Sequence, residues 1–168
     1  MESENPSRQM RIARPDQGPH IRYMKKALLQ AWRAFDRDEV PVGAVVVHRG
    51  QIVGRGFNQP IRQHDPSAHA EILALRHAAR RLGNYRLTSA ALYCTLEPCA
   101  MCAAALVHAR VGMLVYGARD SKAGAVDSHL QLLESRFLNH RVEVIAGILE
   151  DDCSKLLKEF FRLKRIKS

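Results

Sequence analysis

Apolar residues recur along the chain at two different spacings, which predict helices and strands in turn. From Met24 to Phe35 they return every three or four positions, as in an amphipathic helix. The stretches GAVVVH and QIVGRGF then flank Arg49-Gly50, a pattern typical of a β-hairpin. A second helical stripe stops at Gly83, and Asp65-Pro66 predicts its start, with Asp65 as the N-cap and proline in the first turn.

The second half of the chain continues this alternation. ALYCT, GMLVYG and VEVIAG are short apolar runs that predict strands. CAAALVHAR and DDCSKLLKEFFRLKR have helical patterns, and a shorter helix is expected near HLQLLESRF. Because strands alternate with helices, we expect a three-layer α/β/α domain whose central sheet is covered on both faces.

The first residues differ from the rest. Residues 1–19 hold three prolines and few apolar side chains, so we expect a disordered N-terminal arm followed by one domain over residues 20–168. The chain of 168 residues is long enough for one domain with its own core. Its apolar runs are too short to cross a bilayer, and the N-terminus lacks a secretory signal pattern. A cytoplasmic protein without a membrane segment is therefore expected.

The formal net charge of +9 lies in the predicted domain, because acids and bases balance within residues 1–20. From Lys158 onward there are five basic residues and one acidic residue. This distribution suits a polyanionic partner such as a nucleic acid. A basic surface that serves only solubility explains the charge equally well.

Candidate chemistry lies in two short motifs at predicted helix starts. DPSAHAEIL contains His69 and Glu71, and TLEPCAMC contains Cys99 and Cys102. H-x-E alone is common by chance, whereas P-C-x-x-C is far rarer. Cysteines three apart share one helix face, and a helix N-terminus favours their thiolates. With one imidazole they make a three-ligand zinc site, which keeps a fourth position for a water whose pKa falls to about 7.

Two other interpretations of the CxxC pair stay open at this point. A thioredoxin-like redox pair would need neither His69 nor Glu71. A structural zinc knot would need a fourth ligand, and Cys94, His108 and Cys153 are the candidates. Cys94 lies in an apolar strand pattern and Cys153 in a helical one, so both are expected to be buried thiols rather than parts of a disulfide framework.

H-x-E followed by P-C-x-x-C is the signature of zinc-dependent nucleobase deaminases. Over residues 20 to 165, the chain resembles bacterial tRNA-specific adenosine deaminases of the cytidine/deoxycytidylate deaminase superfamily. The matching stretches are PVGAVVV, GFNQPI, HDPSAHAEI, NYRL, TLEPCAMC, YGARDSKAGA, NHRVEV, GIL and EFFRLKR. The resemblance implies a cytidine-deaminase-like fold with a central mixed sheet, and a homodimer. It also implies hydrolytic conversion of the wobble adenosine of a tRNA anticodon to inosine.

The same resemblance assigns roles by position. His69, Cys99 and Cys102 fall on the ligands of one Zn²⁺ per subunit, and Glu71 falls on the residue that moves protons.

Substrate contacts are also implied by the resemblance. Asn58 falls on a residue that contacts the flipped nucleoside, Asp120 and Lys122 lie in a segment that faces the anticodon stem-loop, and Phe161 and Arg162 lie where the last helix meets RNA.

Plainer interpretations of these residues remain. Asn58 and Asp120 are both typical turn residues. Phe160 and Phe161 are adjacent on a predicted helix, so we expect one to be buried and the other to lie near the substrate.

Two other functions compete with tRNA editing. The same fold could deaminate a free base, nucleoside or nucleotide of the guanine or cytidine type, and only the basic charge and the tRNA-type segments argue against it. A zinc-stabilised RNA-binding module without activity is the other alternative. Such a module has no use for Glu71, because a structural site does not need a carboxylate beside an open ligand position.

Overall fold

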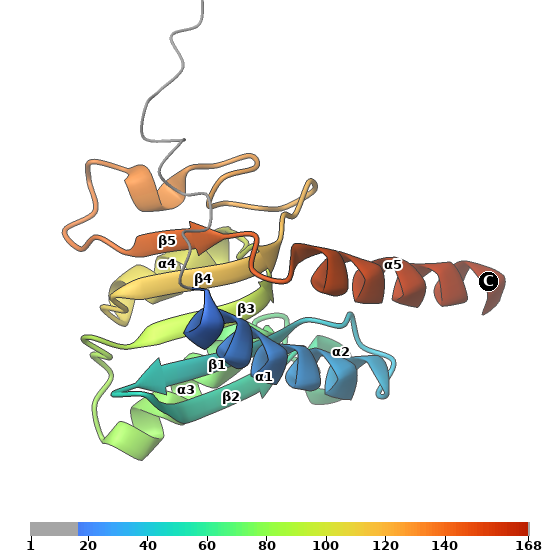
Figure 1. Ribbon diagram of the computed structural model, residues 1–168, viewed down its shortest axis with the longest axis horizontal. Helices are drawn as coiled ribbons and strands as arrows, with labels where there is room; N and C mark the ends of the chain where they lie inside the picture. Colours follow the sequence, from blue (N-terminus) through green and yellow to red (C-terminus); the bar gives the residue numbers. More distant parts are fainter. Residues whose placement is uncertain (1–16, 168) are drawn as a thin grey trace, which may run out of the picture.

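Five strands form one sheet in the computed structural model, which describes residues 17–167 (Figure 1). The expected N-terminal arm falls mostly on residues 1–16, which lie outside the described residues, and the first helix begins at Gly18. The elements in chain order are α1 (Gly18–Phe35), β1 (Gly43–His48), β2 (Gln51–Phe57), α2 (Pro60–Gln63), α3 (Ala70–Leu82), β3 (Ala91–Leu96), α4 (Ala100–His108), β4 (Met113–Ala118), the 3-10 helix η2 (Leu132–Glu134), β5 (Glu143–Ala146) and α5 (Glu150–Lys167).

The sheet is mixed, as expected. Its strand order is β2-β1-β3-β4-β5, with β1 antiparallel to both β2 and β3, and β3, β4 and β5 parallel. The β1–β2 hairpin turns at Arg49 and Gly50, where φ is +49° and +75°, the left-handed conformation of a tight hairpin turn. Helix α4 connects the parallel strands β3 and β4, so their carboxyl ends lie at one edge of the sheet.

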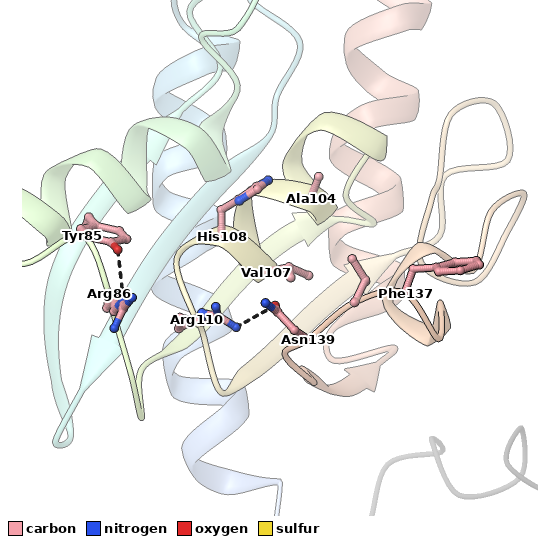
Figure 2. A pocket seen from close by; sticks show the side chains of 9 residues that line it. Tyr85, Arg86, Ala104, Val107, His108, Arg110, Phe137 and Asn139 are labelled. Carbon is pink, nitrogen blue, oxygen red and sulfur yellow. Dashed lines mark hydrogen bonds between the residues drawn. The ribbon is translucent and has the colours of Figure 1, made fainter.

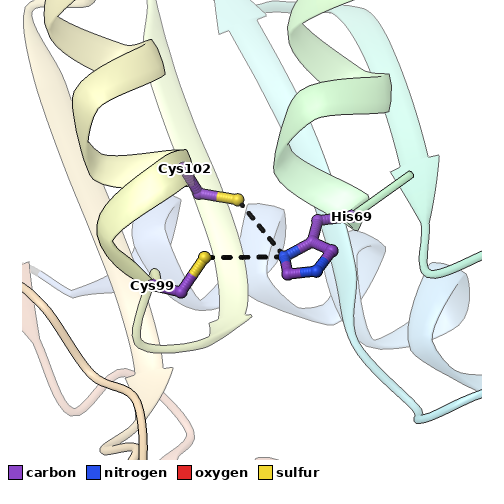
Figure 3. Close-up of side chains that lie close together, drawn as sticks. All are labelled: His69, Cys99 and Cys102. Carbon is purple, nitrogen blue, oxygen red and sulfur yellow. Dashed lines mark hydrogen bonds between the residues drawn. The ribbon is translucent and has the colours of Figure 1, made fainter. Parts of the chain in front are cut away.

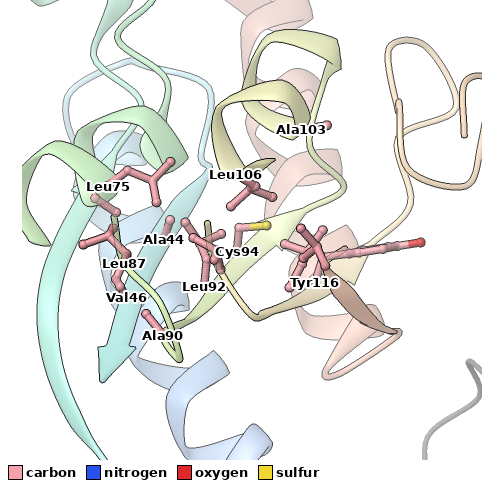
Figure 4. Packing of buried hydrophobic residues seen from close by; sticks show 14 of the residues in the cluster. Ala44, Val46, Leu75, Leu87, Ala90, Leu92, Cys94, Ala103, Leu106 and Tyr116 are labelled. Atoms are coloured by element: carbon pink, nitrogen blue, oxygen red, sulfur yellow. The ribbon is translucent and has the colours of Figure 1, made fainter. Parts of the chain in front are cut away.

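Alternate residues of the strands build two separate cores, one on each face of the sheet. On one face, Ala44, Leu92 and Cys94 pack with Leu75 of α3 and Leu106 of α4 (Figure 4). On the other face, α1 and the start of α5 cover a second cluster of strand residues (Figure 1). The three-layer prediction is confirmed.

The two cysteines outside the CxxC motif lie in these cores. Cys94 is 0% exposed and Cys153 is 1% exposed, which confirms the prediction of buried thiols. Burial raises the pKa of the Cys94 thiol and raises that of Cys153 to about 12.

The first turn of α3 lies directly on β2. A Cβ atom at Gly56 would lie 2.2 Å from the Ala70 carbonyl oxygen, and one at Gly54 would lie 2.3 Å from that of Ala74. Only glycine permits this close approach of helix to strand.

Two details of the predicted helices are wrong. Helix α3 begins at Ala70, with His69 as the N-cap, and not at Pro66. Asp65 instead forms a local turn, in which its carboxylate accepts hydrogen bonds from the amide and hydroxyl of Ser67. Only the short 3-10 helix Leu132–Glu134 forms near HLQLLESRF. The amides of His129 and Leu130 donate to the Gly124 carbonyl and that of Leu132 to the Ala125 carbonyl, so they do not form helical hydrogen bonds.

None of the helices described within residues 17–167 has the length and apolar character needed to cross a membrane.

Candidate metal centre and active site

His69, Cys99 and Cys102 lie together where the N-termini of α3 and α4 meet (Figure 3). The Nδ1 atom of His69 is 3.6 Å from the Sγ atom of Cys99 and 3.6 Å from that of Cys102. The three ligand atoms all lie within 4.8 Å of one another. One imidazole and two thiols this close form a donor set that suits zinc.

Local backbone geometry explains how these side chains meet. His69 and Cys99 are each the N-cap residue of their helix, with extended ψ values of 151° and 174°. Cys102 follows in the first turn of α4. Because His69 precedes the helix, its two-residue spacing from Glu71 is not a helical spacing, and both side chains can serve one site.

Asn58 supports this arrangement from the loop after β2. Its Oδ1 atom accepts a hydrogen bond of 2.9 Å from the amide of Ala70, which is the first residue of α3. Asn58 thus satisfies one of the free amides at the helix N-terminus, next to His69. Its predicted contact with a nucleoside stays a prediction.

The two thiols of the cluster differ in acidity. A hydrogen bond from Cys102 and a second contact with His69 lower the pKa of Cys99 to about 4. The hydrogen bond to Cys99 and burial raise the pKa of Cys102. The contact with Cys99 also raises the pKa of His69. The cluster therefore holds a thiolate that a divalent cation can bind, with release of the remaining protons.

Glu71 lies in the first turn of α3 and is 4% exposed. Burial, with a further contribution from the charge of Cys99, raises the pKa of its carboxyl to about 7. A carboxyl group with a pKa near neutrality can both accept and release a proton, which is the property of a general acid–base residue.

The remaining predicted site residues lie on the loop after β4 and on α5. The Oδ1 atom of Asp120 accepts hydrogen bonds from the amides of Lys122 and Ala123, so Asp120 closes a turn, as its plainer interpretation predicts. The Nζ atom of Lys122 lies 6.0 Å from the ring centroid of Phe161, which brings the loop and α5 together.

Helix α5 separates its two adjacent phenylalanines. Phe160 is 5% exposed and packs edge-on against Phe35, whereas Phe161 is 43% exposed. The expectation that one ring is buried and the other accessible is confirmed. Arg162 is exposed and pairs with Glu159 at 2.6 Å, and no contact described within residues 17–167 joins Arg162 to the metal cluster.

Sequence reasoning missed two buried carboxylates that accept hydrogen bonds from backbone amides. Glu97 and Glu39 are each 1% exposed. Glu39 accepts hydrogen bonds from the amides of Ile61 and Arg62, and Glu97 accepts several from the loop that carries Asp120. For Glu97 the sequence contains one signal, an acidic residue within the apolar run ALYCTLEPCA. A buried charge without partners would be costly, so such a residue is expected to be surrounded by hydrogen-bond donors.

A cavity of about 320 Å³ lies at the other end of α4 (Figure 2). Its lining includes Val107 and His108 of α4, together with Tyr85, Arg110 and Phe137. None of the predicted site residues lines it. The chemically reactive side chains gather at the helix N-termini instead.

Comparison with known proteins agrees with this geometry. Residues 19–165 match the family described as MafB19-like deaminase. The tRNA-specific adenosine deaminase of Haemophilus influenzae is 47% identical over 143 residues, which cover 84% of this chain and 83% of that protein. The tRNA-specific adenosine deaminase of Bacillus subtilis is 44% identical over 145 residues, covering 86% of this chain and 90% of that protein.

Solved structures give the same result. A structure from a study of A-to-I editing by tRNA:A34 deaminases at the wobble position of transfer RNA matches with a TM-score of 0.79 and 43% identity, covering 81% of this chain and 99% of that one. A guanine deaminase from Nitrosomonas europaea matches with a TM-score of 0.69 over 94% of this chain and 93% of that one. At 24% identity, this second likeness shows a shared fold and no more.

Proposed function

The chain belongs to the family of tRNA-specific adenosine deaminases, and from this premise we propose that it converts the wobble adenosine of a tRNA anticodon to inosine with the help of a zinc ion. The observation that carries the proposal is the group of His69, Cys99 and Cys102 beside the buried carboxyl of Glu71. This is the arrangement expected of a zinc-dependent nucleobase deaminase.

The donor set fits zinc. His69 would bind through Nδ1, the ring nitrogen that faces both sulfur atoms, and Cys99 and Cys102 would bind as thiolates. Held by three protein ligands, the ion would act as a Lewis acid that activates a water molecule as the nucleophile. A redox role for the cysteine pair is disfavoured because it would leave His69, at 3.6 Å from both sulfurs, and the buried Glu71 without a function. A closed structural site would need a fourth ligand, but Cys94 and Cys153 lie in the cores and His108 lines the cavity at the other end of α4.

Glu71 would move the protons of the reaction. Hydrolytic deamination adds the oxygen of water to C6 of adenine and releases the exocyclic amine as ammonia. Glu71 would take one proton from the attacking water and pass it to N1 of the ring. It would then take the second water proton from the new hydroxyl at C6 and deliver it to the amine, which departs as ammonia while the C6 carbonyl of inosine forms. A carboxyl whose pKa burial raises to about 7 is suited to both directions of transfer.

The substrate would be an anticodon stem-loop bound by the loop after β4 and by α5. Lys122 and Arg162 would contact phosphates, and the exposed Phe161 ring would stack on a base. Asp120 would face the anticodon loop with Lys122, and Asn58 would contact the flipped nucleoside. We place this reaction in the cytoplasm and the enzyme in a homodimer, as the resemblance to the family implies.

The test is deamination of a synthetic anticodon stem-loop that carries adenosine at the wobble position, with inosine measured by mass spectrometry after nuclease digestion. We expect inosine at that position alone, and negligible conversion of free adenosine, guanine or cytidine. The Glu71→Gln variant should bind zinc normally and lose about 10²–10⁴-fold in rate.

Two outcomes would contradict the proposal. Efficient deamination of a free base or nucleoside without deamination of the stem-loop would make the guanine or cytidine type of activity correct instead. Zinc-dependent RNA binding without conversion of any of these substrates would indicate a binding module.

A further inference from the structure

Glu97 directly follows β3 and precedes Cys99 by two residues, and its side chain is buried. We propose that Glu97 is a positioning residue. It fixes the loop of residues 119–129 against the segment that carries Cys99, and it thereby sets where the RNA-contacting side chains stand relative to the metal cluster. This inference rests on the proposed function and assigns a role to a residue outside the metal set and the proton-transfer group.

The loop is wrapped around the carboxylate of Glu97. Its Oε1 atom accepts hydrogen bonds from the amides of Val126, Asp127 and Ser128 at 3.2, 2.7 and 2.8 Å. Its Oε2 atom accepts from the amide of Asp120 at 3.0 Å and from the hydroxyl of Ser128 at 2.5 Å. Both ends of the loop, Asp120 and Ser128, are thus bound to one side chain.

Backbone hydrogen bonds also join the segment of Glu97 and Pro98 to the end of β4 and to the loop. The amide of Glu97 donates to the carbonyl of Ala118 at 2.8 Å, and the amide of Ala125 donates to the carbonyl of Pro98 at 2.9 Å. Gly124 leaves room for the carboxylate, since a Cβ atom there would lie 2.5 Å from the Cδ and Oε2 atoms of Glu97. Loop and carboxylate therefore fit each other closely.

This arrangement links the metal cluster to the candidate RNA surface. Glu97 precedes Pro98-Cys99 in the chain and holds the amide of Asp120. Asp120 in turn holds the amide of Lys122, whose Nζ atom reaches the exposed ring of Phe161. A shift of the loop at Glu97 would move Asp120 and Lys122 without touching any metal ligand.

The Glu97→Gln variant tests this role with a minimal change of shape. The side-chain amide keeps one acceptor oxygen, but its NH₂ group would face the N–H of Asp120, and two donors cannot bond. We expect full zinc content and cooperative unfolding. The RNA concentration for half-maximal single-turnover deamination should rise at least about 10-fold, the fold-change that corresponds to one hydrogen bond to a charged group. The rate at saturating RNA should stay within about 3-fold of wild type.

Amide hydrogen exchange gives a second readout that does not depend on activity. In Glu97→Gln, amides of residues 119–129 should exchange at least about 10-fold faster, while amides of α3 and α4 keep their protection. Glu39→Gln is the matched control, because Glu39 is equally buried and accepts hydrogen bonds from backbone amides of a different segment, Ile61 and Arg62 of the short helix α2. Its exchange should increase around residues 58–64 and not in residues 119–129.

Several results would overturn the proposal. One is an unchanged half-saturating RNA concentration in Glu97→Gln. A second is a loss confined to the saturating rate, which would place Glu97 with the metal chemistry. A third is a uniform increase of exchange across α3 and α4, which would reduce Glu97 to a general stabilising role. If wild-type protein fails to convert the stem-loop, the proposed function fails, and a wild-type exchange pattern in Glu97→Gln would then independently refute the positioning.

Discussion

Replacing Gly56 by alanine should weaken the metal site without altering any of its ligands. Gly56 lies under the first turn of α3, where an added Cβ atom would be 2.2 Å from the Ala70 carbonyl oxygen and 2.7 Å from the Ala74 amide nitrogen. Both are backbone atoms of the helix, so no side chain can rotate away. Ordinary contacts of a Cβ begin near 3.4 Å, and the start of α3 must therefore move away from β2 by about 1 Å.

His69 immediately precedes this turn, so the displacement changes its distance to the two sulfurs. Metal–ligand distances tolerate only about 0.2 Å, and a shift of about 1 Å exceeds that tolerance. We expect zinc affinity to fall by about 10–100-fold, as when the support of a ligand is removed. Overpacking against a backbone should also lower the free energy of unfolding by about 2–3 kcal/mol and the Tm by roughly 4–12 °C.

The assay is competition for zinc with a chromogenic chelator, together with thermal unfolding. Gly112→Ala is the control, since a Cβ there would meet no atom closer than 3.6 Å. Gly54→Ala contacts α3 one turn further from His69, at 2.3 Å from the Ala74 carbonyl oxygen. It should lower the Tm like Gly56→Ala but change zinc affinity less. Wild-type zinc affinity in Gly56→Ala would refute the claim that this helix–strand contact positions His69.

Three further predictions concern the metal, the thiols and the RNA. Purified protein should contain about one zinc per chain by elemental analysis, and Cys99→Ser or Cys102→Ser should lose both metal and activity; full zinc occupancy in either variant would contradict the three-ligand site. With zinc bound, a disulfide reagent at pH 8 should find no fast-reacting thiol among the four cysteines. Chelation should expose one, Cys99, whose pKa is lowered to about 4, because the pKa values of Cys94, Cys102 and Cys153 are all raised. Replacing Arg162, Lys164 and Arg165 together by alanine should flatten the salt dependence of stem-loop deamination, with zinc content unchanged. The log–log slope should fall by about 0.7 for each phosphate that the variant no longer neutralises. An unchanged slope would show that the end of α5 does not contact RNA.

The strands and their order of appearance follow from hydrophobic periodicity, but helix boundaries near the site do not. Asp65-Pro66 has the residues typical of a helix start, but the Asp65 carboxylate instead accepts hydrogen bonds from Ser67 and forms a turn before the helix. The chain stays extended through His69, which lets its ring face the cysteines, and α3 takes its cap from Asn58, eleven residues earlier than the N-cap. A cap supplied from a distant loop leaves no local pattern. The sheet order is equally invisible locally, since it depends on pairings between strands far apart in the chain.

The metal ligands could be predicted from the sequence, whereas the position of the loop after β4 could not, and the reason is physical. Zinc accepts few donor types, so histidine and cysteine at fixed spacings reveal it even in one sequence. The loop after β4 is held through backbone amides of Asp120, Val126, Asp127 and Ser128, and every residue except proline offers such an amide. Apart from the Ser128 hydroxyl, which also donates to Glu97, the identities of these residues therefore give no indication of the acceptor. The sequence does contain the acceptor, Glu97, as an acidic residue within an apolar run, and the glycine at position 124 that leaves room for its carboxylate. Only the fold brings Glu97 and Gly124 together.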